Sequence, residues 1–171
     1  MTERSAAGLA GLGAALAGYA SGVTLVAAAD GRDDIASTVS AFCPVSQDPP
    51  LVLVALMAES YLAEVLSRED GPAGFAVTLL AAGQRALAGA FAAAGRPGAR
   101  RMLEDVPHLR GRESGALIPA GGLAALDCRT VSLTPVGDHV MILGQVTDIP
   151  YLDDSGEPLI RFRGRYPVLG R

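Results

Sequence analysis

The sequence predicts a mainly β protein with short helices, folded as a closed or half-closed antiparallel barrel. About six or seven runs are rich in β-branched and apolar residues, and most of them follow one another as hairpins. Only two or three short helical stretches lie between them, which favours an antiparallel barrel over a parallel sheet. The 171 residues fit a single domain covering 1–171, long enough to bury a sizeable core.

The first hairpin pairs residues 22–27 with a central stretch, through a turn that begins at Asp30-Gly31. The central stretch, 38–45, alternates β-branched and aromatic residues with small polar ones and is predicted to be one strand. Asp48-Pro49-Pro50 ends that strand, because proline has no N–H for a ladder. The apolar run 51–56 is predicted to be a buried strand.

The middle of the chain carries the predicted helices. Ser60 is a plausible N-cap for a short helix over 61–66, with Arg68 near its end. A strand is expected over 74–80 and a helix over 84–94, where Leu87 and Phe91 share one face. Residues 95–112 contain glycine, arginine and proline without a clear period and predict a long loop.

The last third is strand-rich. Residues 123–133 and 139–149 predict a hairpin around a turn at 135–138. A final short strand is expected over 159–165, where Gly164 permits a bend.

The N-terminus, 1–18, predicts a helical lead-in. Residues 6–20 are apolar and small, but Thr2-Glu3-Arg4 has no net charge, unlike the positive start of a signal peptide. The run is broken by glycines and is too short to span a bilayer. We therefore expect a cytoplasmic protein without a membrane partner.

Charge and composition exclude several function classes. The net charge is -4 and tryptophan is absent, so a nucleic-acid partner is not expected. All 14 basic residues are arginine, and asparagine is also absent. Schiff-base lysine chemistry, a P-loop and N-glycosylation are therefore ruled out.

The cysteines and histidines predict no metal site. Cys43 and Cys128 match no zinc spacing, and with His108 and His139 they form no recognisable ligand set. We expect each cysteine to be free and buried.

Several polar residues have two interpretations. Ser37, Thr38 and Ser40 indicate either an edge strand with solvated hydroxyls or a surface where amides and hydroxyls meet a flat polar ligand. Ser60 is either a simple cap or part of an anion site at a helix start. Arg100-Arg101 is either a solvated pair or an anion contact.

Five segments, in order, resemble the short-chain flavin reductases, the small components of two-component monooxygenases. The resemblance covers roughly residues 15–167. The segments read Y-A-S-G-V-T-L-V (19–26), T-V-S-A-F-C-P-V-S-Q-D-P-P-L-V-L-V (38–54), F-A-V-T-L-L (75–80), D-C-R with G-D-H (127–129 and 137–139) and P-L-I-R-F-R-G-R-Y (158–166).

The resemblance implies an FMN-binding split β-barrel, antiparallel and Greek-key-like, assembled as a homodimer with flavin near the interface. It implies hydride transfer from NADH or NADPH to FMN or FAD, and delivery of reduced flavin to a partner monooxygenase. Such chemistry belongs to the cofactor, so the lack of a catalytic triad or carboxylate pair in this sequence is consistent with it. The residues leave the choice of flavin and of nicotinamide donor open.

The resemblance also implies site residues. His139 would face the nicotinamide as the catalytic residue; the alternative is a structural strand histidine. The residues that would bind cofactor are Ser37, Thr38, Val39, Ser40, Ala41, Ser46, Ser60, Arg101, Arg165 and Tyr166.

Three positions depart from the family pattern. Glu59 stands close to the expected flavin phosphate, where like charges at 4 Å would repel by about 1 kcal/mol in water. Ser40 replaces an asparagine, and Ala36 replaces a glycine. Either Glu59 points away and Arg100 or Arg101 neutralises the phosphate, or flavin binds weakly.

Three functions therefore compete. The first is a flavin reductase. The second is a non-reductase protein that binds flavin or another small ligand on the same barrel, which Glu59 favours. The third is a structural interaction domain, which the 95–112 loop permits.

Overall fold

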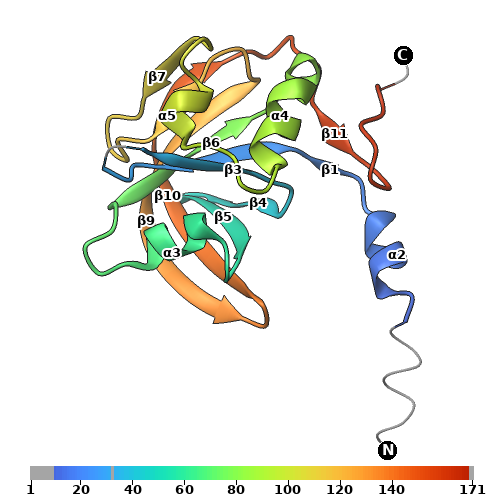
Figure 1. Ribbon diagram of the computed structural model, residues 1–171, viewed down its shortest axis with the longest axis horizontal. Helices are drawn as coiled ribbons and strands as arrows, with labels where there is room; N and C mark the ends of the chain where they lie inside the picture. The colour runs from blue at the N-terminus through green and yellow to red at the C-terminus, as the bar shows by residue number, and fades with distance from the viewer. Residues whose placement is uncertain (1–9, 32, 170–171) are drawn as a thin grey trace, which may run out of the picture.

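The computed structural model describes residues 10–31 and 33–169, and its centre is one antiparallel sheet of seven strands (Figure 1). The strand order is β3-β2-β6-β9-β10-β5-β4. The bounds are β2 Thr24–Ala28, β3 Ile35–Val39, β4 Phe42–Gln47, β5 Pro50–Met57, β6 Gly74–Leu79, β9 Ala124–Val136 and β10 His139–Leu152. The predicted antiparallel hairpins β2–β3, β4–β5 and β9–β10 are confirmed.

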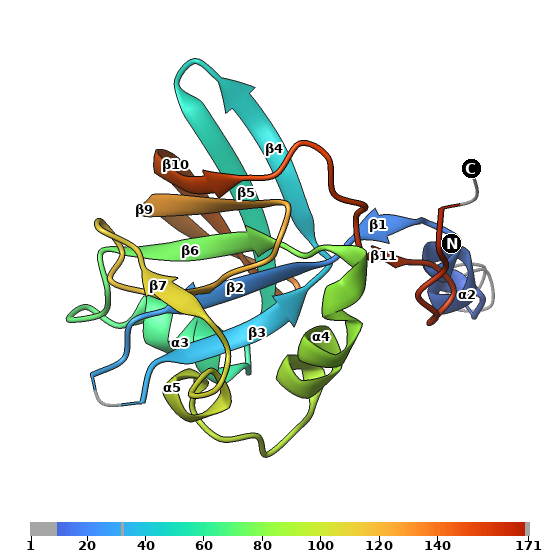
Figure 2. The same ribbon diagram turned by 90° about the horizontal axis from the view of Figure 1, so that it is seen from above.

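The two edge strands show why the sheet curls. β3 and β4 lie at opposite ends of the strand order, yet only Ser40 and Ala41 separate them in the chain. The two edges must therefore meet at one end, and the sheet rolls into a barrel that stays split between β3 and β4 (Figure 2). The prediction of a half-closed barrel is correct.

Shorter elements surround the sheet. β1 Ser21–Gly22 pairs with β11 Ile160–Arg161, and β7 His108–Arg110 pairs with β8 Leu117–Pro119. The helices are α2 Leu12–Ala17, α3 Tyr61–Ser67, the 3-10 turn η1 Ala82–Gln84, α4 Arg85–Ala92 and α5 Ala99–Met102.

Two apolar cores lie on the two faces of the sheet. The barrel interior holds Val54, Phe75 and Ile142, and α3 closes it with Leu62 and Leu66. The outer face of β2, β3 and β6 packs against α4, α5 and the β7–β8 pair, with buried side chains that include Phe91, Leu103 and Ile118. In Figure 1, α3 lies on one side of β3, and α4 and α5 lie on the other.

Helix α3 is fixed at both ends by polar contacts. The Ser60 hydroxyl accepts the Ala63 N–H at 3.3 Å, so the predicted N-cap is confirmed. At the other end Arg68 donates to Asp30 at 3.1 Å and to Glu64 at 2.8 Å. The β2–β3 turn and the helix are thereby held together beside the start of β3.

Four sequence-based expectations differ from the structure. Residues 38–45 are not one strand, because the chain leaves one sheet edge at Val39 and joins the other at Phe42. The 95–112 stretch contains α5 and β7, and residues 159–165 contribute only the two-residue β11. Cys43 is exposed on the edge strand β4 rather than buried, although Cys128 is buried and both thiols are free.

The N-terminal lead-in is helical over α2, and residues 1–9 lie outside the described part. α2 buries no side chain and stands off the barrel (Figure 1). Within the described residues, no helix is both long and apolar enough to cross a bilayer.

Candidate functional site

A cavity of about 220 Å³ lies between the end of β3 and the end of β5, beside the split. It is lined by Ser37, Thr38, Val39, Ser40, Ala41, Ala55, Leu56, Met57, Ser60 and His139. Seven of these residues were predicted from the sequence. The other three, Ala55, Leu56 and Met57, form the end of β5, and the sequence marked the first two only as part of an apolar run.

The edge of β3 supplies the polar wall of this cavity. Asp34 O accepts the Ala99 N–H at 3.0 Å, and Ala36 O accepts the Arg96 guanidinium at 2.7 and 3.3 Å. Both carbonyls thus point away from β2. In an antiparallel strand, the N–H and C=O groups of every second residue point to the same side. Those of Thr38 therefore point away from β2, as those of Ala36 do.

Thr38 therefore carries an open donor and acceptor pair. α5 caps the edge at Asp34 and Arg96 caps it at Ala36, but within the described residues nothing bonds the Thr38 backbone on that side. Unpaired N–H and C=O groups at a strand edge are ready to pair with another group. Beside the cavity they fit a flat ring whose rim alternates donors and acceptors.

The three hydroxyls on this edge are not equivalent. The Thr38 hydroxyl donates to Ala88 O of α4 at 3.2 Å, so it fixes the strand to the helix. The hydroxyls of Ser37 and Ser40 have no side-chain hydrogen bond to any described residue. These two remain available to a ligand or to solvent, so both interpretations of this stretch stay open.

His139 stands at the other side of the cavity, at the first position of β10. Its Nδ1 donates to the Asp138 carboxylate at 2.6 Å, and this bond holds the pKa of Asp138 below its usual value. The ring is held in one orientation, and about 40% of the side chain is exposed. Nε2 is therefore the free ring nitrogen.

Four predicted binding residues do not line this cavity. Ser46 lies on β4 opposite Leu51, and Arg101 is exposed on α5. Arg165 exchanges backbone hydrogen bonds with Phe162, and the Tyr166 ring lies under the Arg85 guanidinium, 5.4 Å from it. Their assignment to the flavin stays a prediction.

The structure places two of the charged residues that the sequence associated with the flavin phosphate, Glu59 and Arg100. Glu59 is exposed, next to the cavity-lining Ser60. Arg100 is held by the buried Asp34 at 3.3 Å, a carboxylate that it shares with Arg110 at 2.9 Å. Among the residues that line the cavity, His139 is the only one that can carry a positive charge.

The D-C-R segment has a structural role that the sequence did not reveal. The buried Asp127 carboxylate accepts the N–H groups of Glu113 and Ser114 at 2.8 and 3.2 Å. Cys128 packs in the barrel core, and burial together with the Asp127 charge raises its pKa to about 12. Arg129 donates to Gln145 at 2.7 Å. These residues hold the loop after β7 and the β9–β10 ladder.

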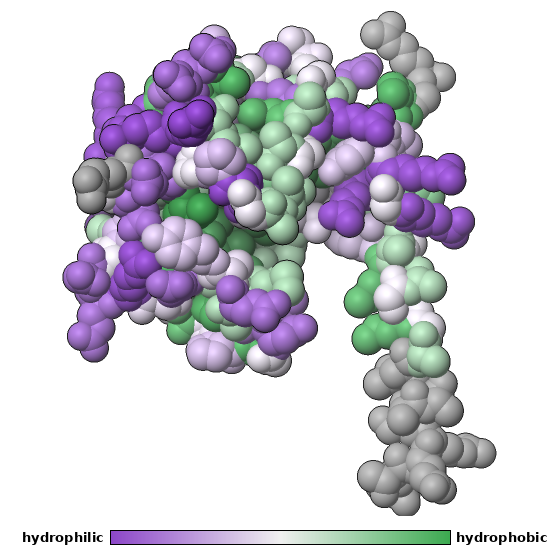
Figure 3. All heavy atoms as spheres, in the orientation of Figure 1, coloured by the Kyte–Doolittle hydropathy of each residue, from purple (hydrophilic) through white to green (hydrophobic). Residues whose placement is uncertain are grey.

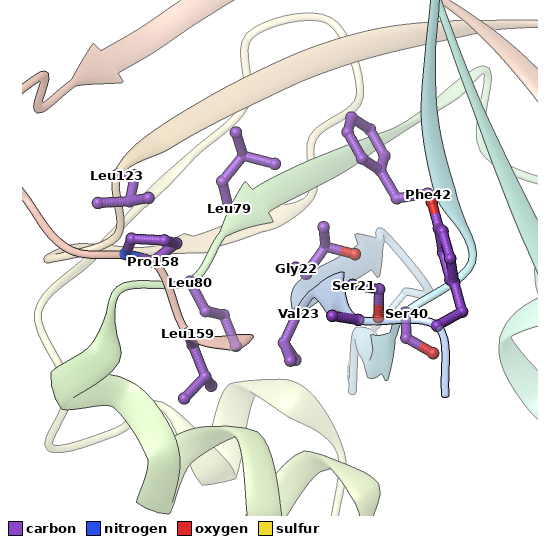
Figure 4. A pocket seen from close by; sticks show the side chains of 13 residues that line it. Ser21, Gly22, Val23, Ser40, Phe42, Leu79, Leu80, Leu123, Pro158 and Leu159 are labelled. Carbon is purple, nitrogen blue, oxygen red and sulfur yellow. The ribbon is translucent and has the colours of Figure 1, made fainter. Parts of the chain in front are cut away.

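Two further hollows adjoin the cavity, and Ser40 lines all three. One, of about 310 Å³, has Leu79, Leu80 and Leu159 on one side and the hydroxyls of Ser21 and Ser40 on the other (Figure 4). The other is a groove of about 500 Å³ beside α2. Across 10–31 and 33–169, no three His, Cys, Asp or Glu side chains gather as a metal site would require.

The fold and the cavity define a class: an open antiparallel barrel with a hollow of about 220 Å³ beside its split edge. A family model described as a flavin reductase like domain matches residues 16–170. The chain belongs to this family.

Individual relatives agree with the family. The reductase component of 4-hydroxyphenylacetate 3-monooxygenase from Thermus thermophilus is 40% identical over 152 residues, covering 89% of this chain and 91% of that protein. The NADH-dependent FMN reductase AsuE2 from Streptomyces nodosus subsp. asukaensis is 36% identical, covering 86% and 78%.

A solved structure gives the same fold. The NADH:FAD oxidoreductase SgcE6 from Streptomyces globisporus superposes with a TM-score of 0.85 at 31% identity, covering 94% of this chain and 92% of that one. The predicted split-barrel fold is therefore confirmed.

Proposed function

We propose that the chain is an NAD(P)H:flavin oxidoreductase that reduces FMN or FAD and supplies the reduced flavin to a partner monooxygenase. The carrying observation is the open backbone edge at Thr38, beside a cavity that also holds His139. Family membership and the activities named for its relatives support it.

The cavity residues fit the isoalloxazine ring of a flavin. The ring has two apolar faces and a rim of N–H, C=O and ring nitrogen groups. Val39, Ala55 and Leu56 give apolar contact, while the Thr38 backbone and the Ser37 and Ser40 hydroxyls offer donors and acceptors. The bound flavin would supply the redox chemistry, and the protein would bind and orient it.

His139 would orient the reactants from the rim. The bond to Asp138 holds Nδ1, so Nε2 can exchange a hydrogen bond with a ligand in the cavity. Hydride transfer needs no acid–base pair from the protein, so positioning is the role that this geometry supports.

A homodimer would complete the site. Ligand cavities span about 300–1,000 Å³, more than this cavity holds in one chain. The part of the β9–β10 hairpin next to its turn exposes Val131, Leu133 and Val136, and the neighbouring strand β5 exposes Met57. Exposed apolar side chains on this hairpin and at the cavity-lining Met57 fit a second copy of the chain.

Delivery of reduced flavin to a partner monooxygenase is consistent with a cavity that is open and has no arginine in its lining. A carrier that releases reduced flavin does not need a tight phosphate clamp. The relative from T. thermophilus is itself named as a reductase component of a monooxygenase.

The second function is a flavin- or small-ligand-binding protein without reductase activity. Glu59 favours it, because an exposed carboxylate next to the cavity repels a flavin phosphate. Two experiments separate the possibilities. Flavin-dependent oxidation of NADH or NADPH marks the reductase, and flavin binding without that oxidation marks the binding protein.

A further inference from the structure

The groove beside α2 has a composition unlike that of the cavity. Its volume is about 500 Å³. Leu16 and Tyr19 from the N-terminal segment, Arg161 and Arg163 from the C-terminal segment, and Ser40 with Ala41 line it. In Figure 3 the apolar helix stands apart from the barrel, and hydrophilic side chains gather where it joins the body.

The charge around this groove is of one sign. The sequence has no charged residue between Arg4 and Asp30, none from 35 to 47, and only arginine after Glu157. Neither Arg161 nor Arg163 forms an ion pair within the described residues, and both are exposed. A protein of net charge -4 therefore presents a locally positive groove, which attracts anions.

The groove and the cavity share two lining residues. Ser40 and Ala41 line both hollows, so a ligand whose ring lies against Thr38 can pass over these two small residues into the groove. The cavity supplies ring contacts without arginine, and the groove supplies two guanidinium groups and one aromatic ring, that of Tyr19. Guanidinium groups match phosphate oxygens, and aromatic side chains stack on bases.

We propose that the Arg161–Arg163 groove binds the pyrophosphate of a dinucleotide cosubstrate whose reactive ring occupies the Thr38 cavity. The inference rests on the proposed function and adds the site for the charged part of a reactant. NADH and FAD both carry such a pyrophosphate, whereas FMN does not. Comparing kinetics with FMN and with FAD therefore shows whether the groove binds NADH or FAD.

The test compares wild type with the double variant R161Q/R163Q in steady-state turnover of NADH with FMN and with FAD. The control is R112Q, an exposed arginine that lines a different hollow. If the groove holds NADH, KM for NADH rises at least tenfold with either flavin, and KM for FMN stays within threefold. If it holds FAD, KM rises only for FAD. Unchanged KM values for both overturn the proposal.

A binding measurement keeps the groove testable apart from catalysis. Calorimetric titration of ADP should show binding to wild type that weakens at least tenfold in R161Q/R163Q and not in R112Q. Circular dichroism checks that each variant is folded. A wild-type protein without turnover but with arginine-dependent ADP binding would refute the reductase and keep the groove. Equal ADP affinity in wild type and the double variant refutes the groove.

Discussion

His139 lies directly opposite Met57 in the β5–β10 ladder, and this register places the imidazole at the cavity rim. The register is set by the tight Gly137-Asp138 turn, where Gly137 has φ +61°, and by buried partners such as Ile142 opposite Val54. A slip of one residue would turn His139 to the other face of the sheet.

His139→Ala should lower kcat/KM for NADH about tenfold, the effect of losing one hydrogen bond that orients the reactants. KM for flavin should change less than threefold. His139→Gln keeps an N–H donor and should recover part of the loss. Steady-state kinetics of both variants checks this, and wild-type kinetics in His139→Ala would remove the histidine from the mechanism.

Thr38→Pro should weaken flavin binding at least tenfold, because proline removes the open N–H that we assign to the flavin rim. The strand should tolerate the change, since this N–H makes no ladder bond and proline is accepted on edge strands. Thr38→Val is the matched control: it keeps the N–H and removes the hydroxyl that donates to Ala88. Quenching of flavin fluorescence measures both affinities, and equal affinities would contradict the assignment.

Asp34→Asn should destabilise the protein by about 1.5–3 kcal/mol at neutral pH, the usual value of hydrogen bonds to a charged group. The buried carboxylate accepts Arg110 at 2.9 Å and Arg100 at 3.3 Å. Asparagine suits the backbone, since residue 34 has φ +48°. The exposed Asp33→Asn is the control, and urea unfolding measures both.

The same residue predicts a pH dependence. Burial opposes ionisation of Asp34, but the hydrogen bonds from Arg110 and from the Asp30 N–H lower its pKa overall. A lowered pKa in the folded state gives stability that is fully present above the unfolded pKa of about 3.9 and is lost as pH falls through the folded value. The wild-type advantage over Asp34→Asn should be constant above about pH 5 and shrink below pH 4. A constant difference down to pH 2 would contradict the ion pair.

One thiol should react in the native protein. Cys43 is exposed, whereas Cys128 is buried with its pKa raised to about 12, and the thiolate is the reactive form. A disulfide reagent should titrate one thiol in buffer and two in denaturant. Cys43→Ser should abolish the native reaction. Two rapidly reacting native thiols would show that Cys128 is accessible.

Val131→Asp with Leu133→Asp should convert a dimer to a monomer in sedimentation, because an unpaired charge buried at an interface costs several kcal/mol. Both side chains are exposed in the single chain, so its folding should be unaffected. Ile149→Asp, also exposed but further along β10, is the control. A wild-type monomer would contradict the homodimer, and a variant that still dimerises would place the interface elsewhere.

The sequence predicted what is encoded locally. Runs of β-branched residues marked the hairpins, and Ser60 marked the start of α3. The break at Ser40-Ala41 carries no glycine or proline. The sequence therefore predicted a single strand where β3 ends and β4 begins on the opposite edge of the sheet. α5 has four residues and β7 has three, too few for a periodic pattern.

The site residues were likewise predictable where they are neighbours in the chain and not where the fold alone brings them together. Residues 37–41 were predicted together because they are neighbours in the chain, and the β5–β10 ladder brings His139 to them. The Arg161–Arg163 groove was missed, because its walls come from three segments that only the fold unites. Arg101 was chosen for its charge and Tyr166 by resemblance, and neither lines the cavity: Arg101 lies on α5 and Tyr166 packs under Arg85.

The most direct test of the account is the oxidation of NADH and NADPH by the purified chain with FMN or FAD present, followed by the absorbance of the reduced nicotinamide. The account predicts steady turnover that depends on added flavin and saturates in both substrates. Folded protein that oxidises neither donor with either flavin would contradict the reductase and leave a split barrel that only binds its ligand.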